Sequence, residues 1–194
     1  MNYPCSFTYH DFRRDWANKS NLVSWFCLVG SVVLALLIVK IDANNNVARW
    51  VELIGFIGLM LAVKHSVDLA VELDQVTNLG RLLWSISATT LILLTLIAVS
   101  LSINPNIWFI TAPVLVKRAS TWAILYEAKR DGRDVSDRCH SVDLAESTLL
   151  IFGICLALSP LNGWVFSVVE LWTFAFAGIA SFISLVEHIK RFVD

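Results

Sequence analysis

The sequence predicts an all-α fold, a polytopic helical bundle of about six transmembrane helices in a membrane. Apolar residues make up 57% of the chain and its mean hydropathy is +0.67. Charged residues are 16%, against about 25% in a typical soluble domain. Long uncharged runs recur along the chain, and Lys and Arg concentrate in alternate connecting segments. A net charge of −1 gives no basis for a nucleic-acid partner.

The first predicted span contains no charged residue, whereas the second contains several. Ser20–Val39 includes no charged residue and, at 1.5 Å per residue, can cross a hydrocarbon layer of about 30 Å. Trp50–Ala70 follows a polar turn and has Glu52 and Lys64 toward its two ends, where a lysine can extend to the interface. We therefore expect a first helical hairpin.

Two further hairpins follow from breaks within uncharged runs. Residues 82–116 are too long for one span, and Asn104-Pro105-Asn106 in their middle is a strong turn signal. The run 147–169 is broken by SPLNG at 159–163, so that the sixth span extends from about Trp164 to Val186. The weak second and fourth spans and the short fifth span leave a four-span alternative open. The predicted divisions are a cytoplasmic N-terminal segment 1–21, four spans in 22–116, a polar loop or helix 117–146, a hairpin 147–186 and a cytoplasmic tail 187–194.

The distribution of basic residues predicts the orientation. If the N-terminus is cytoplasmic, thirteen of the fifteen Lys and Arg residues lie on the cytoplasmic side, and only Lys40 and Arg49 lie outside. Both termini are then cytoplasmic and the external turns are short. The expected location is a bacterial inner (cytoplasmic) membrane.

The hexapeptide HSVDLA occurs at His65–Ala70 and again at His140–Ala145. On a helix, the first copy places His65, Asp68 and Glu72 on one face, and the second does so for His140 and Asp143. Imidazole and carboxylate at this spacing can bind a metal, form a proton-linked cluster or be solvated and ion-paired, and we favour the last. Different flanking residues argue against duplication. The candidate metal ligands are His65, Asp68, Glu72, His140, Asp143 and His188.

Two acids lie inside predicted spans. Glu52 and Glu170 each occur as Val-Glu-Leu near the external end of an even-numbered span. A charged side chain at the bilayer centre costs about 2.5–3.5 kcal/mol on insertion scales, so such residues are functional candidates. Glu170 lies deeper in its span and is the better candidate for a polar lining, and ion handling, hydrogen bonding between helices and interfacial exposure are its alternatives.

The functional prediction starts from the catalytic and cofactor-binding motifs that the sequence lacks. The sequence has no GxSxG, HExxH, P-loop or GxGxxG motif, and its four cysteines form no CxxC pair. We expect no cofactor and a non-enzymatic scaffold, sensor or oligomeric subunit that binds a cytoplasmic protein, besides the lipid bilayer and other copies or subunits. The alternatives are a small transporter or channel using Glu170 and the His/Asp/Glu cluster, or a metalloenzyme at that cluster. The candidate docking residues are Lys117, Arg118, Arg130, Arg133 and Arg138.

Overall fold

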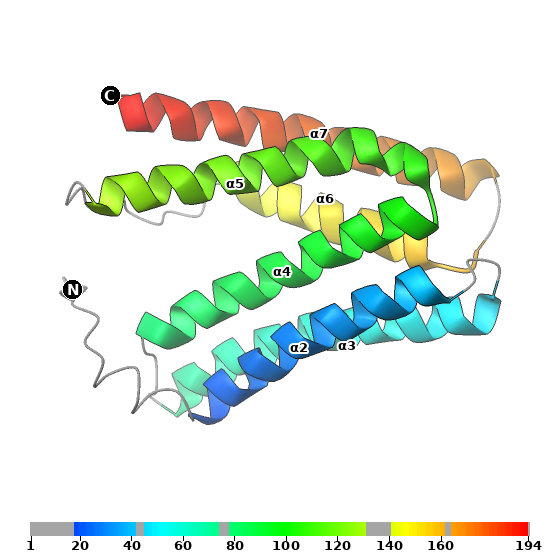
Figure 1. Ribbon diagram of the computed structural model, residues 1–194, viewed down its shortest axis with the longest axis horizontal. Coiled ribbons are helices and arrows are strands. Elements are labelled where there is room, and N and C mark those ends of the chain that lie inside the picture. Colours follow the sequence, from blue (N-terminus) through cyan, green and yellow to red (C-terminus); the bar gives the residue numbers. More distant parts are fainter. Residues whose placement is uncertain (1–17, 42–44, 74–77, 131–140, 162–163, 194) are drawn as a thin grey trace. The chain divides into compact units, whose positions relative to one another are not determined.

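The fold is all-helical in the computed structural model, which describes residues 18–41, 45–73, 78–130, 141–161 and 164–193 (Figure 1). No strand occurs in these ranges, and the all-α class predicted from the sequence is confirmed for them. The elements are α2 (Lys19–Lys40), α3 (Asn46–Glu72), α4 (Asn78–Ser102), the 3₁₀ turn η1 (Pro105–Ile107), α5 (Trp108–Arg130), α6 (Ser141–Leu158) and α7 (Trp164–Val193).

Four of the helices in the described ranges are long and apolar enough to cross a membrane. Their outer surfaces carry large apolar side chains, such as Phe26 at 67% exposed and Trp172 at 60%. A soluble protein rarely exposes so continuous an apolar surface, whereas lipid solvates it. The chain thus has the make-up of a membrane protein. The four segments are Lys19–Lys40, Asn46–Glu72, Leu83–Ser102 and Trp164–Glu187.

Asparagine side chains begin two of the elements. The Asn45 side chain accepts a hydrogen bond from the Ala48 amide at 3.2 Å, where α3 begins. The Asn104 side chain accepts one from the Asn106 amide at 3.2 Å, and Pro105 opens η1 directly after it. Such caps satisfy amides that have no partner in the first turn of a helix. The chain therefore turns at the two Asn-rich positions that the sequence indicates.

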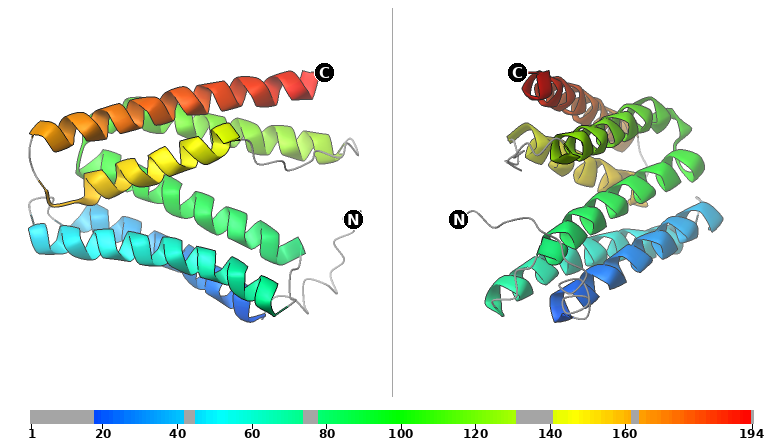
Figure 2. Two further views of the ribbon diagram at one scale, coloured as in Figure 1. Left: turned by 180° about the vertical axis from the view of Figure 1, so that it is seen from behind. Right: turned by 60° about the vertical axis from the view of Figure 1, so that its left-hand side comes forward.

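The chain divides into two compact units, and the boundary lies within α4, between Ala98 and Val99. In the N-terminal unit, α2 and α3 run antiparallel and side by side (Figures 1 and 2). Small hydroxyl residues join its helices: Ser24 donates to the Ser66 hydroxyl at 3.3 Å, and Ser87 of α4 donates to the Ser24 carbonyl at 3.1 Å. Small residues let helix backbones approach closely in membrane proteins.

In the C-terminal unit, α7 packs against both α5 and α6, and α6 runs antiparallel to the other two helices (Figure 2). Gly153 of α6 is required by this packing. A Cβ atom at this position would lie 2.8 Å from a ring carbon of Phe174, which is fully buried in α7. A larger residue at this position would therefore have to displace the buried Phe174 ring.

The predicted polar segment 117–146 is helical at both of its ends. Helix α5 continues through Lys117 to Arg130, and α6 begins at Ser141; residues 131–140 lie outside the described ranges. Where the two helices are described, Lys117 and Arg118 of α5 pair with Asp143 and Glu146 of α6.

Candidate functional site

The candidate site is built around Lys117, a lysine that is only 2% exposed. It lies on the inward face of α5, one and two helical turns after Val114 and Ile110, which are also buried. Its ammonium donates to the Asp143 carboxylate at 2.9 Å and to Oε2 of Glu146. Asp143 and Glu146 are three residues apart and so share one face of α6.

Two further side chains complete the site. Arg118 places Nη2 3.7 Å from Oε1 of Glu146 and 3.4 Å from the Ser147 hydroxyl. From α7, the Ser184 hydroxyl donates to the same Asp143 oxygen that Lys117 contacts. We call Lys117, Arg118, Asp143, Glu146 and Ser184 the Lys117 cluster.

The charges of the Lys117 cluster cancel, because two cations face two carboxylates. Removing a single ion from water costs several kcal/mol, and only close pairing with additional hydrogen bonds compensates for that cost. Lys117 and Glu146 are both buried, whereas the side chains of Asp143 and Arg118 are 20% and 23% exposed. Lys117 and Glu146 are therefore enclosed by protein, whereas Asp143 and Arg118 reach the molecular surface.

Glu170 lies elsewhere on α7, also in the C-terminal unit. It is half-buried, and its carboxylate accepts a hydrogen bond from the Asn104 side chain at 3.2 Å. Between Glu170 and Ser184, the inward face of α7 presents Thr173 and Ser181, both less than 10% exposed. Polar groups thus occur along the interior of this unit, separated in the middle by apolar side chains such as Phe174.

Glu52 belongs to the N-terminal unit and is 3% exposed. It lies on the inward face of α3 with Phe56 and Val63, and it interacts electrostatically with Arg49 one turn before it. Of the two acids that the sequence indicates inside spans, Glu52 is therefore the more deeply buried, and Glu170 accepts a hydrogen bond from Asn104 in the turn after α4.

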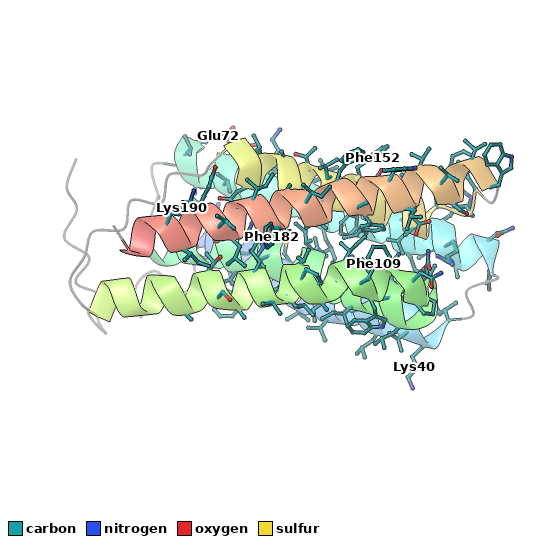
Figure 3. All side chains as sticks on the ribbon, turned by 90° about the horizontal axis from the view of Figure 1, so that it is seen from above. Lys40, Glu72, Phe109, Phe152, Phe182 and Lys190 are labelled. Carbon is teal, nitrogen blue, oxygen red and sulfur yellow. The ribbon has the colours of Figure 1, made fainter. Side chains whose placement is uncertain are left out.

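The two HSVDLA copies face different surroundings. In the first copy His65 and Asp68 are exposed, as is Glu72 at the end of α3 (Figure 3), while Ser66 and Ala70 are buried. In the second copy the equivalent of Asp68, Asp143, is half-buried in the Lys117 cluster, and the equivalent of Ala70, Ala145, is exposed. The same six residues therefore present opposite faces to the protein interior.

The candidate metal ligands do not converge in the part of the chain that the structure describes. No group of three or more His, Cys, Asp or Glu side chains there could hold a metal ion. Asp143 is engaged by Lys117 and Ser184. His140 lies outside the described residues, and the His188 side chain is likewise not described.

The candidate docking residues also lie in different environments. Lys117 is enclosed within the C-terminal unit rather than presented to a partner, and Arg118 is partly exposed beside Glu146. The Arg130 side chain, Arg133 and Arg138 lie outside the description. Sequence reasoning missed Glu146 and Ser184 as cluster members. The available signal was that α5 and the start of α6 carry opposite charges at the edges of apolar runs.

Comparisons of the chain with protein-family models, with curated proteins and with solved structures found no match. A functional proposal for this protein therefore depends on the chemistry and placement of its own residues.

Replacing Lys117 with Met tests the Lys117 cluster, because Met keeps an unbranched side chain and removes the charge. We expect Lys117→Met to lower the free energy of unfolding by about 3–5 kcal/mol, since two carboxylates would then face only Arg118. The measurement is denaturant or thermal unfolding of the purified protein in detergent.

Two further variants control this experiment. Lys64→Met alters an exposed lysine, so its effect should stay within about 0.5 kcal/mol. The double variant Lys117→Met/Glu146→Gln removes one charge of each sign and should recover most of the stability. A Lys117→Met protein as stable as Lys64→Met would show that the ion pairs between α5 and α6 do not stabilise the fold.

Proposed function

We propose that the protein is a non-enzymatic integral membrane protein, a scaffold, sensor or subunit that binds a protein partner at the C-terminal end of α3. The observation that carries this proposal is the placement of His65, Asp68 and Glu72. All three are exposed and lie on one face of α3, whereas Ser66 and Ala70 on the opposite face are buried. We call His65, Asp68 and Glu72 the α3 stripe.

The chemistry of the α3 stripe indicates the kind of partner. Two carboxylates and an imidazole favour a basic segment, and charges at the rim of an interface mainly affect the association rate and its salt sensitivity. The acids of the C-terminal unit differ in this respect, because Asp143 and Glu146 already face Lys117. The carboxylates of the α3 stripe are therefore more accessible to a partner than those of the Lys117 cluster.

The proposal includes six spans with both termini cytoplasmic, in a bacterial inner membrane. Two features support it. The basic residues concentrate on one side of such a topology. In addition, the charges of α5 and α6 cancel in the Lys117 cluster, which lowers the cost of placing these two helices at membrane depth.

A cysteine at residue 136 distinguishes six spans from four. In a cysteine-free background, Ser136→Cys should react with membrane-impermeant reagents only from the cytoplasmic side if α5 and α6 both cross the membrane. If only α2, α3, α4 and α7 cross the membrane, the same residue lies outside, although both termini remain cytoplasmic. Asn45→Cys is the control, because both topologies place it outside. Labelling of residue 136 from outside would reject the six-span topology.

Photo-crosslinking in native membranes tests the partner. A crosslinking amino acid at His65 should yield a discrete protein adduct, and the same amino acid at Leu36, an exposed apolar position of α2, should not. The charge reversals Asp68→Lys and Glu72→Lys should reduce the adduct severalfold, most strongly at low salt. Equal adducts at His65 and Leu36, or no effect of the reversals, would argue against a docking role.

A second candidate function is the passage of protons or small cations through the C-terminal unit. The specific observation is the inward face of α7, where Glu170, Thr173, Ser181 and Ser184 follow one another along one side. An acid lies at each end of this row, since Ser184 contacts Asp143. Intramembrane acids that face a bundle interior frequently mark such pathways.

Flux into vesicles tests this second function. Glu170→Gln preserves the shape of the side chain and removes its charge, so it should abolish most of any proton or sodium flux by the reconstituted protein. Glu72→Gln, at an exposed position, is the matched control and should leave the flux unchanged. Equal flux in Glu170→Gln and the unaltered protein would remove Glu170 from the pathway.

A further inference from the structure

The outward face of α3 carries a continuous row of residues that stay exposed within the part of the chain that is described. In the left view of Figure 2, α3 lies in front of α2. The apolar part of the row is Val47, Val51, Ile54, Gly58 and Leu61, and its four larger members are 60–74% exposed. The α3 stripe continues the same row. We call these residues together the outer row of α3.

The spacing of the outer row is that of a helix-packing seam. From Val47 to Glu72, its members follow one another at alternating intervals of four and three residues. This repeat keeps one side of a helix against a partner helix along its length. Phe56, Val63 and Ala70 have the same period on the inward face, where α3 packs against α2. Lipid also covers exposed apolar rows, so the argument for a protein partner depends on two further features.

The first feature is Gly58, at the centre of the row. A Cβ atom at this position would meet no other atom within 4 Å. At Gly30, Gly55, Gly153 and Gly178, a Cβ atom would lie within 4 Å of a side chain from another helix. Glycine destabilises a helix relative to alanine, and in membrane proteins it is enriched where a second helix approaches closely. The open space at Gly58 therefore fits a helix that is not among those described.

The second feature is the charge at one end of the row. Asp68 lies ten residues, or about 15 Å, from Gly58, and Val47 lies about 16 Å away in the other direction. The apolar part thus matches a hydrocarbon core of about 30 Å, with Asp68 and Glu72 at its boundary. Membrane proteins concentrate Lys and Arg at the cytoplasmic ends of their spans, and the two carboxylates complement such an end. Lys64 is exposed beside the row and leaves the acids in excess.

A second copy of the chain fits the outer row less well. Copies in one membrane have the same orientation, so two α3 helices paired through this row would be parallel. In a parallel pair with this repeat, each residue faces its equivalent. Asp68 and Glu72 would then lie beside the same two acids of the other copy, and like charges in contact oppose association.

We propose that the outer row of α3 binds one transmembrane helix of a different protein, with Lys or Arg at the cytoplasmic end of that helix. The bound helix runs along α3, fills the space at Gly58 and pairs its basic residues with Asp68 and Glu72. The inference rests on the proposed partner at the end of α3, and it names the class of that partner as an integral membrane protein.

Photo-crosslinking from within the bilayer tests the proposal in native membranes. A crosslinking amino acid at Ile54 should yield an adduct of the same mass as the adduct from His65. Mass spectrometry of the crosslinked peptide should place it in a membrane-spanning helix with Lys or Arg at the cytoplasmic end. A peptide from a helix without such a basic end would overturn the charge pairing and with it the proposal.

Two variants examine the two features separately. Gly58→Leu should reduce the adducts from Ile54 and His65 severalfold, because the new side chain fills the space that the partner occupies. The variant should fold, since leucine is the better helix former and its Cβ meets no neighbour. Asp68→Lys should also reduce both adducts, most strongly at low salt. Val29→Leu, at an exposed position of α2, is the matched control and should leave them unchanged.

The outcomes distinguish this inference from the proposed function. An adduct from His65 without one from Ile54 would identify a soluble partner, which overturns the inference and leaves the proposed function intact. The absence of both adducts would contradict both. An Ile54 adduct at twice the mass of the chain would identify a second copy, and adducts that Gly58→Leu does not reduce would show a contact elsewhere. Either of these two results overturns the transmembrane partner.

Discussion

The C-terminal unit depends on one electrostatic constraint: a lysine that water does not reach needs carboxylates from another helix. Lys117 meets this need with Asp143 and Glu146, and Ser184 ties the arrangement to α7. The three helices are thus joined by a directional interaction in addition to apolar packing. Where the surrounding medium is as apolar as the side chains, burial of apolar area alone specifies helix pairs poorly. Polar contacts of this kind decide which helix lies against which.

Most of the secondary structure could be predicted because its signals are local. An uncharged apolar run of about twenty residues forms a helix in a bilayer, because its backbone must pair within the segment. Asn104-Pro105 ends one helix and begins the next for reasons confined to those residues. The helical bundle and its turns follow from such signals. Helix boundaries within the charged segment 117–146 do not follow from local signals. They depend on whether the charges meet partners, and these partners are 26 and 29 residues away in sequence.

The same distinction explains why the site was only partly predictable. Glu52 and Glu170 stand out because each is an acid in an apolar run. From the sequence alone, Lys117 is expected at the surface, and only the structure shows Asp143 and Glu146 beside it. The HSVDLA repeat is the clearest case, because its two copies have identical letters, yet Ala70 is buried and Ala145 is exposed. Which face of a helix turns inward is set by the neighbouring helices and not by the six residues themselves.

The two units satisfy buried polarity by different chemistry, and this difference bears on function. In the N-terminal unit, serine hydroxyls bridge α2, α3 and α4, as in the contact between Ser24 and Ser66. The C-terminal unit instead joins α5 to α6 through carboxylates and cations, and α7 contributes the Ser184 hydroxyl. Hydroxyls keep the same charge throughout the physiological pH range, so the serine contacts of the N-terminal unit are insensitive to protons. Constant geometry of this kind suits the docking role that we propose for the α3 stripe of the N-terminal unit.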